Sequence, residues 1–282
     1  MSKSLFIATL EPGGGKSVAA LGIMELLSRR LQNIGFFRPI IPDVKRDNNI
    51  QLILTRYNLR PAYEDMYAYK HEEARHMVSH GQYDLLLKTI LVKYKTLESR
   101  CDFVLCEGTD YTGVSSAFEF DFNAGVANNL GCPILAVVNG RGKSPEEILD
   151  ATRFARDAFG SQGCTLLAIL ANRVEPQHVD LINTRLKYET SVKEPVYILP
   201  EEQLLGKPTI GEIAANLESR LLQGDPDGLN REVLDIKIAA MNLPHFLDYI
   251  SDGTLVITPG DRSDVILGSL AATVSETYPN IS

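Results

Sequence analysis

The fold is decided by a stretch near the start of the chain that reads Leu5-Phe6-Ile7-Ala8-Thr9-Leu10-Glu11-Pro12-Gly13-Gly14-Gly15-Lys16-Ser17. A short apolar strand runs into a glycine-rich turn, and Lys-Ser then opens a segment of helical period. Glycines allow consecutive backbone N–H groups to turn toward an anion without a clash at Cβ, and the start of a helix adds partial positive charge. This order of elements predicts a phosphate-binding loop.

Each residue of the predicted loop has an expected role. Gly13, Gly14 and Gly15 would bind through their backbone, Lys16 would contact the β- and γ-phosphates, and Ser17 would ligate Mg²⁺. The expected ligands are ATP, or another nucleotide or phosphate anion, and Mg²⁺. The loop departs from the pattern G-x-x-x-x-G-K-[ST] at Leu10, where the pattern has glycine. A glycine-rich turn that begins an ordinary helix remains the alternative.

The rest of the chain alternates short β-rich runs with segments of helical period. Several runs are apolar at every position, which is typical of parallel strands covered on both faces. We predict an α/β fold with a doubly wound, mostly parallel sheet of the P-loop NTPase type. The expected strands are Leu5–Thr9, Ile34–Phe37, Phe103–Cys106, Ile134–Val138, Leu166–Leu170 and Val196–Leu199. The expected helices are Lys16–Gln32, Tyr83–Glu98, Ala124–Leu130, Pro145–Phe159, Val179–Tyr188 and Ile210–Leu222.

A turn-forming stretch at residues 223–228, Gln-Gly-Asp-Pro-Asp-Gly, indicates a domain boundary. We therefore predict a P-loop domain over residues 1–222 and a second, smaller α/β unit over residues 229–282. The second unit has few residues for an independent core and is expected to be incomplete. Its expected elements are a strand or helix at Val233–Met241, a helix at Pro244–Ile250, a strand at Thr254–Thr258 and a helix from about Arg262.

Acidic residues at strand ends are candidate metal ligands. Glu107 follows the apolar run Phe103–Cys106, and the ligand crevice of a doubly wound sheet lies at such strand ends. We predict that Glu107 joins Ser17 in binding Mg²⁺, with Asp47 as a further acidic ligand. A solvated acidic turn at Glu107 and a helix cap at Asp47 are the alternatives.

Two more polar side chains are predicted at the same crevice. Arg38 ends the second strand and can hold an anion in bidentate fashion, although a plain surface charge is nearly as well supported. Asn172 can offer its amide to a nucleobase edge, while loop capping is the commoner use of such a residue. His71, His76 and His80 form no complete zinc set, so a solvated helix end is the preferred interpretation.

Composition and charge exclude several classes of protein. Of the 282 residues, 44% are hydrophobic and 23% are charged, which suits a globular core and not a disordered chain. The formal charge of −8 disfavours general binding to nucleic acid. Since no apolar run approaches about 18 residues and no signal-peptide cleavage site is present, we predict a cytoplasmic protein without a membrane partner. The four cysteines show no metal-ligand spacing and are expected to be reduced, buried thiols.

The order of the motifs resembles that of a known family. The chain resembles dethiobiotin synthetase-like P-loop domains in the order of five segments, which are Gly13–Ser17, Phe37–Ile40, Cys106–Gly108, Asn172–Val174 and Pro200–Thr209. The segment Val256–Asp264 resembles the DRTGG-type regulatory module of long-form phosphate acetyltransferases. Together they resemble the N-terminal region of that enzyme over nearly the whole chain.

This resemblance implies a nucleotide- or anion-sensing regulatory region. The family's reaction, acetyl transfer between coenzyme A and phosphate, would be performed by a C-terminal acyltransferase domain that the sequence does not contain. The chain is therefore expected to be a shortened form or a naturally short relative, without catalytic residues for acetyl transfer and at most a weak ATPase. Its expected partners are the nucleotide or anion, that acyltransferase domain and further copies of itself.

Two departures from related families limit the catalytic expectation. Dethiobiotin synthetases have lysine where this chain has Arg38, and partition-type ATPases carry a signature lysine where it has Glu11. Charge reversal at Glu11 would oppose stabilisation of the transferring phosphate. A free-standing ATP-dependent carboxylating ligase similar to dethiobiotin synthetase, and a purely structural oligomerisation platform, are the alternative functions.

Overall fold

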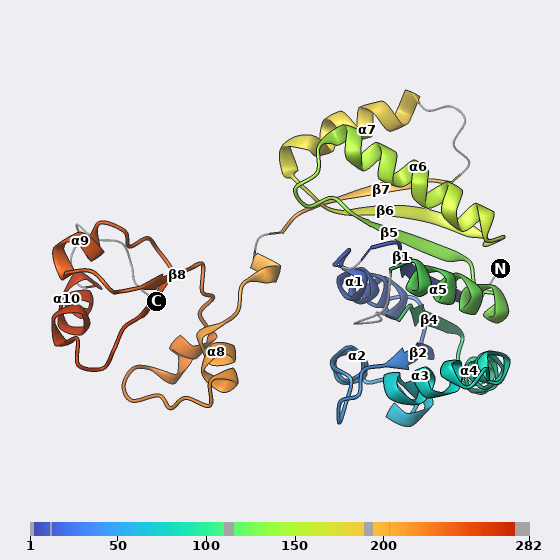
Figure 1. The fold of residues 1–282 in the computed structure, drawn as a ribbon, viewed down its shortest axis with the longest axis horizontal. Helices are drawn as coiled ribbons and strands as arrows, with labels where there is room; N and C mark the ends of the chain where they lie inside the picture. The colour runs from blue at the N-terminus through green and yellow to red at the C-terminus, as the bar shows by residue number, and fades with distance from the viewer. Residues whose placement is uncertain (1–2, 12, 110–115, 189–193, 203, 274–282) are drawn as a thin grey trace. The chain divides into compact units, whose positions relative to one another are not determined.

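The protein is described from a computed structural model that covers residues 3–11, 13–109, 116–188, 194–202 and 204–273. It forms two compact units, Met1–Glu201 and Glu202–Ser282 (Figure 1). The domain boundary predicted at residues 223–228 stays a prediction. In the structure these residues belong to the second unit, because helix α8 (Ile210–Asn216) packs against the short helix η4 (Pro226–Asn230).

The described part of the first unit contains a seven-stranded sheet in the order β3-β2-β4-β1-β5-β6-β7. Every neighbouring pair runs parallel. Parallel neighbours need crossover connections, and helices supply most of them. The strands are β1 (Ser4–Thr9), β2 (Ile34–Ile41), β3 (Tyr67–Lys70), β4 (Phe103–Glu107), β5 (Ile134–Asn139), β6 (Leu166–Val174) and β7 (Val196–Pro200).

Helices cover both faces of this sheet (Figure 1). Successive residues of β1 serve opposite cores: Phe6 packs in one cluster and Ile7 in the other. This explains why β1 is apolar nearly throughout, and it confirms the predicted doubly wound α/β class. The helices of this unit are α1 (Lys16–Ser28), α2 (Asn48–Tyr57), α3 (His71–Ser79), α4 (Tyr83–Glu98), α5 (Ser116–Leu130), α6 (Pro145–Ser161) and α7 (Val179–Tyr188), with short η1 (Tyr63–Asp65) and η2 (Pro176–His178), whereas the short helix η3 (Leu204–Gly206) belongs to the second unit.

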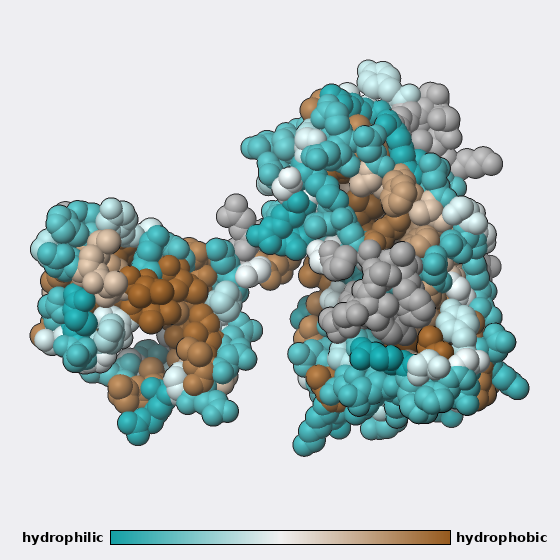
Figure 2. Space-filling model, viewed as in Figure 1, coloured by the Kyte–Doolittle hydropathy of each residue, from teal (hydrophilic) through white to brown (hydrophobic). Residues whose placement is uncertain are grey.

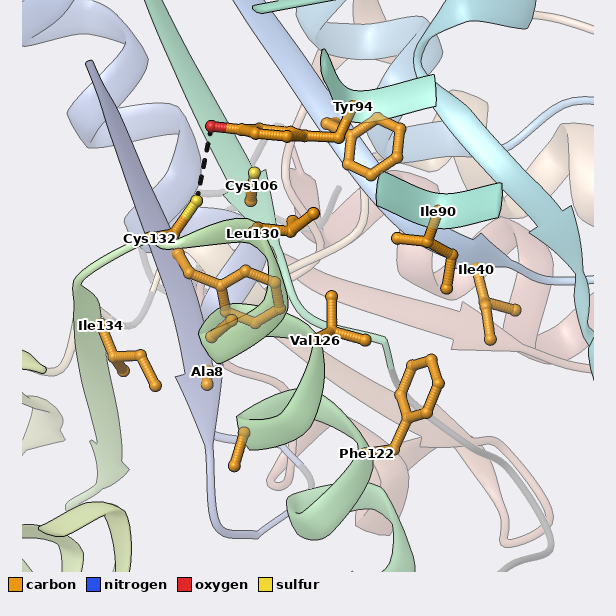
Figure 3. Close-up of a cluster of buried hydrophobic side chains, with 14 of the residues drawn as sticks. Ala8, Ile40, Ile90, Tyr94, Cys106, Phe122, Val126, Leu130, Cys132 and Ile134 are labelled. Carbon is orange, nitrogen blue, oxygen red and sulfur yellow. Dashed lines mark hydrogen bonds between the residues drawn. The ribbon is translucent and has the colours of Figure 1, made fainter. Parts of the chain in front are cut away.

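One of these cores includes a polar contact between cysteine and tyrosine (Figure 3). The Cys132 thiol lies 3.5 Å from the Tyr94 hydroxyl and 3.2 Å from the Ser4 hydroxyl. Cys106, beside them, is fully buried, and burial raises the pKa of its thiol. The four cysteines are free, and Cys101, Cys106 and Cys132 are buried as expected, but Cys164 is only half-buried.

Two strands reach further than the sequence suggests. β2 continues through Arg38 to Ile41 because β3, which the sequence analysis missed, pairs with Arg38, Ile40 and Ile41. β6 continues through Asn172 and Arg173 to Val174, which pairs with β7. Arg38 therefore lies inside its strand and not at the end of it, and Asn172 lies in a strand and not in the loop after it. Helix α6 starts with a capping box formed by Ser144 and Glu147.

The second unit is built around a two-stranded parallel sheet of β8 (Asp235–Ile238) and β9 (Thr254–Ile257). Helices α9 (Leu243–Leu247) and α10 (Ser263–Thr273) complete it, with Phe246 and Val265 in a small core. Arg262 holds the turn before α10, because it pairs with Asp264 and donates to the Met241 carbonyl at 2.9 Å. Many large hydrophobic side chains remain exposed, among them Ile238 and Leu267, and hydrophobic areas are visible on this unit in Figure 2.

Candidate functional site

The glycine-rich loop between β1 and α1 has the backbone of an anion-binding cradle. Gly13 and Gly15 adopt the left-handed region with φ of 75° and 82°, and α1 begins at Lys16. A Cβ on Gly15 would stand 2.3 Å from the Asn172 amide nitrogen. That nitrogen donates to the Gly14 carbonyl at 3.0 Å, so Asn172 braces the loop from β6. Only glycine fits this combination of φ and close approach.

Lys16 points inward from the first turn of α1 and is almost completely buried. Its ammonium lies 3.6 Å from a carboxylate oxygen of Glu119 on α5 and 3.5 Å from the Thr109 carbonyl. Asn123, one turn after Glu119, holds Thr109 through two hydrogen bonds of 2.9 Å and 3.0 Å. Lys16 therefore lies where three segments meet, namely the first turns of α1 and α5 and the end of β4.

Ser17 and Glu107 are in direct contact, which is the proximity that the predicted shared Mg²⁺ site needs. The Ser17 hydroxyl donates to a Glu107 carboxylate oxygen at 2.9 Å. Asn49, in the first turn of α2, donates to the same hydroxyl at 2.7 Å and to both Glu107 oxygens at 3.0 Å and 3.1 Å. A hydroxyl and a carboxylate at one point are ligands of the kind that Mg²⁺ uses.

Arg38 joins two carboxylates behind this pair. Its guanidinium lies 3.5 Å from Glu107 and pairs with Asp47, and all three side chains are buried. Asp47 also caps α2 by accepting from the Ile50 amide at 2.9 Å. The carboxyl ends of β2 and β4 bring these groups together, since Phe37 and Cys106 are register partners. A buried ion pair of this kind fixes the position of each partner.

The protonation of Glu107 reflects opposing effects. Complete burial raises the pKa of this carboxyl, because desolvation disfavours the charged form. The Arg38 guanidinium, the Ser17 hydroxyl, the Asn49 amide and the Lys16 ammonium act in the opposite direction without cancelling it. A bound cation would favour the ionised form further.

A ring of charges surrounds the outer end of the loop. Lys143, from the turn after β5, pairs with Glu11 at 2.5 Å. Arg173, at φ 63° in β6, donates to the Gly13 carbonyl at 3.4 Å and pairs with Glu201 at 3.0 Å. Arg141 approaches the same Glu201 oxygen at 3.3 Å. Glu11 is thus paired with a lysine from elsewhere in the chain.

The structure brings the predicted residues into one connected site. Gly13–Ser17, Arg38, Asp47, Glu107 and Asn172 are linked by the contacts above, but two side chains have different neighbours from those expected. Both Asp47 oxygens already contact Arg38 or the Ile50 amide. The Asn172 amide nitrogen is committed to Gly14. Their proposed roles as metal ligand and nucleobase contact remain predictions.

Sequence reasoning missed four contributors: Asn49, Thr109, Glu119 and Asn123. Glu119 and Asn123 were missed because the helix was predicted to begin only at Ala124, whereas α5 begins at Ser116. Asn49 and Glu119 belong to no motif in the sequence, and only the fold places them beside Ser17 and Lys16.

The solvated helix end expected for the histidines does not hold for His71, which is buried at the start of α3. His76 and His80 stack on α3 with ring centroids 4.1 Å apart, and a His80 ring nitrogen lies 2.8 Å from the His76 carbonyl. Within the described residues, no three His, Cys, Asp or Glu side chains gather as a metal site. In the same part of the chain, no helix is both long and apolar enough to cross a bilayer.

The parallel sheet, the glycine cradle and the Ser17–Glu107 contact define a P-loop nucleotide-binding α/β protein. Residues 3–213 match the AAA domain family, and the chain belongs to that family. Residues 212–276 match the DRTGG domain. The predicted succession of a P-loop domain and a DRTGG-type module is thereby confirmed.

Curated relatives match along the entire chain. Phosphate acetyltransferase of Nitratidesulfovibrio vulgaris is 45% identical over 290 residues, covering 100% of this chain and 41% of that protein. Phosphate acetyltransferase of Synechocystis is 37% identical with the same two coverages. The chain thus spans less than half the length of these relatives. A solved complex of a Cyanothece McdA variant with ATP matches with a TM-score of 0.44 and 15% identity over 81% of this chain and 92% of that one.

Proposed function

We propose that this chain is a nucleotide-binding regulatory region of a phosphate acetyltransferase. In the proposed protein, a separate C-terminal domain transfers the acetyl group between coenzyme A and phosphate. Whole-chain similarity to two phosphate acetyltransferases supports this assignment. The proposed ligand is ATP, or another nucleotide or phosphate anion, with Mg²⁺.

The observation that carries the proposal is the geometry of the loop at residues 13–17. Two left-handed glycines, a buried lysine and a helix start converge there, which is the arrangement that binds polyphosphates. A side chain at position 15 would collide with the brace that holds the loop open. The residues present therefore fit a phosphate group.

The same residues have separable roles in the proposed complex. The loop amides and Lys16 would hold the phosphates, and Ser17 with Glu107 would hold Mg²⁺, which would neutralise phosphate charge. Asn49 orients both metal-binding side chains. Arg38 stabilises the ionised form of Glu107 and keeps Asp47 in place. The ligand would regulate the acetyltransferase if its affinity differs between two arrangements of the domains in the whole protein.

Titration calorimetry of Mg·ATP into the purified chain tests the binding step. We expect saturable heat for the natural sequence and its loss in Lys16→Ala, because the principal phosphate-binding cation is removed. Lys88→Ala, which removes an exposed lysine from α4, is the matched control and should bind like the natural sequence. Equal, negligible heats in all three proteins would refute nucleotide binding.

Regulation is tested on the full-length protein. Acetyl phosphate formation is measured with and without Mg·ATP, in the natural sequence and in Lys16→Ala. We expect the nucleotide to change the rate only when Lys16 is present. A rate that responds equally in both proteins would contradict regulation through this site.

A cytoplasmic location and self-association are also proposed, and light scattering over a range of concentrations tests the latter.

A further inference from the structure

Glu119 lies beside the lysine that the phosphate loop would offer to its ligand. Its carboxylate is 3.6 Å from the Lys16 ammonium, and the two side chains are only 9% and 4% exposed. Lys16 is the residue expected to contact the β- and γ-phosphates. The loop's principal cation is therefore already paired with an anion that belongs to the protein.

The position of Glu119 is fixed by the local structure. It lies in the first turn of α5, where the helix favours negative charge. Asn123, four residues later on the same helix, is fully buried and bonded to Thr109. Thr109 in turn contacts Lys16 through its carbonyl. This part of α5 therefore faces the site, with Glu119 beside the lysine.

A buried ammonium requires a nearby anion, and a phosphate could serve equally well. When a polyphosphate enters, its oxygens compete with Glu119 for the same ammonium. Mg²⁺ at Ser17 and Glu107 would offset the charge of Glu107. Glu119 lies on a different element, α5, and it pairs with Lys16, not with the proposed Mg²⁺. Once phosphate oxygens take up Lys16, the negative charge of Glu119 therefore stands beside the negative charge of the phosphates.

We propose that Glu119 is a specificity-determining residue that competes with the β- and γ-phosphates of the ligand for Lys16. This inference rests on the proposed function, because it concerns the same nucleotide site. Glu119 lowers affinity for ligands that need the lysine and leaves affinity for a nucleoside monophosphate unaffected. The site is thereby tuned to respond only at high concentrations of the polyphosphate.

The first test compares Glu119→Gln with Asp121→Asn. Asp121 is exposed on the same helix, so its substitution changes the net charge equally without touching Lys16. We expect Glu119→Gln to bind Mg·ATP and Mg·ADP about tenfold more tightly, since a like charge beside the phosphates is removed. AMP affinity should stay the same, and Asp121→Asn should match the natural sequence throughout. Unchanged or weaker ATP binding in Glu119→Gln would overturn the inference while leaving nucleotide binding intact.

A second measurement needs no nucleotide. The melting temperature is recorded against inorganic phosphate for the natural sequence and both variants. With its internal partner gone, Lys16 in Glu119→Gln should gain an anion more readily, so phosphate should stabilise this variant more than the others. Equal phosphate responses in all three proteins would overturn the inference. If ATP fails to bind the natural sequence while the phosphate response of Glu119→Gln is larger, the proposed function fails, and the inference survives only as competition between Glu119 and an anion for Lys16.

Discussion

Substitution of Gly15 by alanine should destabilise the first unit through two separate effects. The residue sits at φ 82°, where an L-side chain costs roughly 1–2 kcal/mol. The added Cβ would stand 2.3 Å from the Asn172 amide nitrogen, which must then leave its hydrogen bond to Gly14. Loss of that bond costs about 1 kcal/mol. Adding the two costs gives an expected loss of about 2–3 kcal/mol in the free energy of unfolding.

Two companion variants separate these effects. Gly13→Ala introduces the same unfavourable φ, 75°, with no atom within 4 Å of the new Cβ, so it should cost only about 1–2 kcal/mol. Asn172→Ala removes the neighbour that collides with residue 15. In that background, Gly15→Ala should cost no more than Gly13→Ala, which gives a measurable coupling between positions 15 and 172.

Urea unfolding followed by far-UV circular dichroism provides the assay, since the chain has no tryptophan to report by fluorescence. The two compact units can unfold separately, so hydrogen exchange of peptides from residues 3–30 assigns the loss to the loop. Equal costs for Gly15→Ala and Gly13→Ala, or a larger cost in the Asn172→Ala background, would refute the reasoning.

Four other predictions concern charge and backbone. Because burial raises the pKa of Glu107, the folded state holds the proton of this carboxyl more tightly than the unfolded state, so the contribution of Glu107 to stability falls as pH rises from the unfolded pKa through the raised folded pKa. In urea titrations at several pH values, the free energy of unfolding should therefore depend less steeply on pH in Glu107→Gln than in the natural sequence. Mg²⁺ binding, followed by calorimetry, should weaken as pH falls through the raised pKa of Glu107. Arg38→Met leaves two buried carboxylates without their guanidinium and should cost about 3–5 kcal/mol in urea unfolding, and a loss below about 1 kcal/mol would contradict a structural ion pair. Glu11→Gln breaks a half-exposed pair and should change the same free energy by less than about 1 kcal/mol. Gly22→Ala, inside α1 with open space around it, should raise the melting temperature, reflecting about 0.5–1 kcal/mol of added stability.

The strands of the sheet and the glycine loop were predictable because their signals are local. Runs such as Phe103–Glu107 are short and apolar at nearly every position, which is typical of a strand covered on both faces. Strand β3 (Tyr67–Lys70) was missed because it is a short edge strand with polar residues, and it forms only beside β2. Helix α5 was predicted too short because polar and aromatic residues alternate between Phe118 and Asn123, a pattern without helical period.

The sequence by itself determined the phosphate loop, since the order of strand, glycines, Lys16 and Ser17 dictates a local backbone that turns N–H groups outward. It also indicated Glu107, because a carboxylate at the end of a buried strand must reach the carboxyl edge of the sheet. Only the tertiary structure decided which charges neutralise one another. Glu119 reaches Lys16 from a different helix, and Lys143 reaches Glu11 across 132 positions of sequence. Pairings of this kind depend on distances between elements, and those distances are set by the packing of helices on the sheet and not by any local pattern.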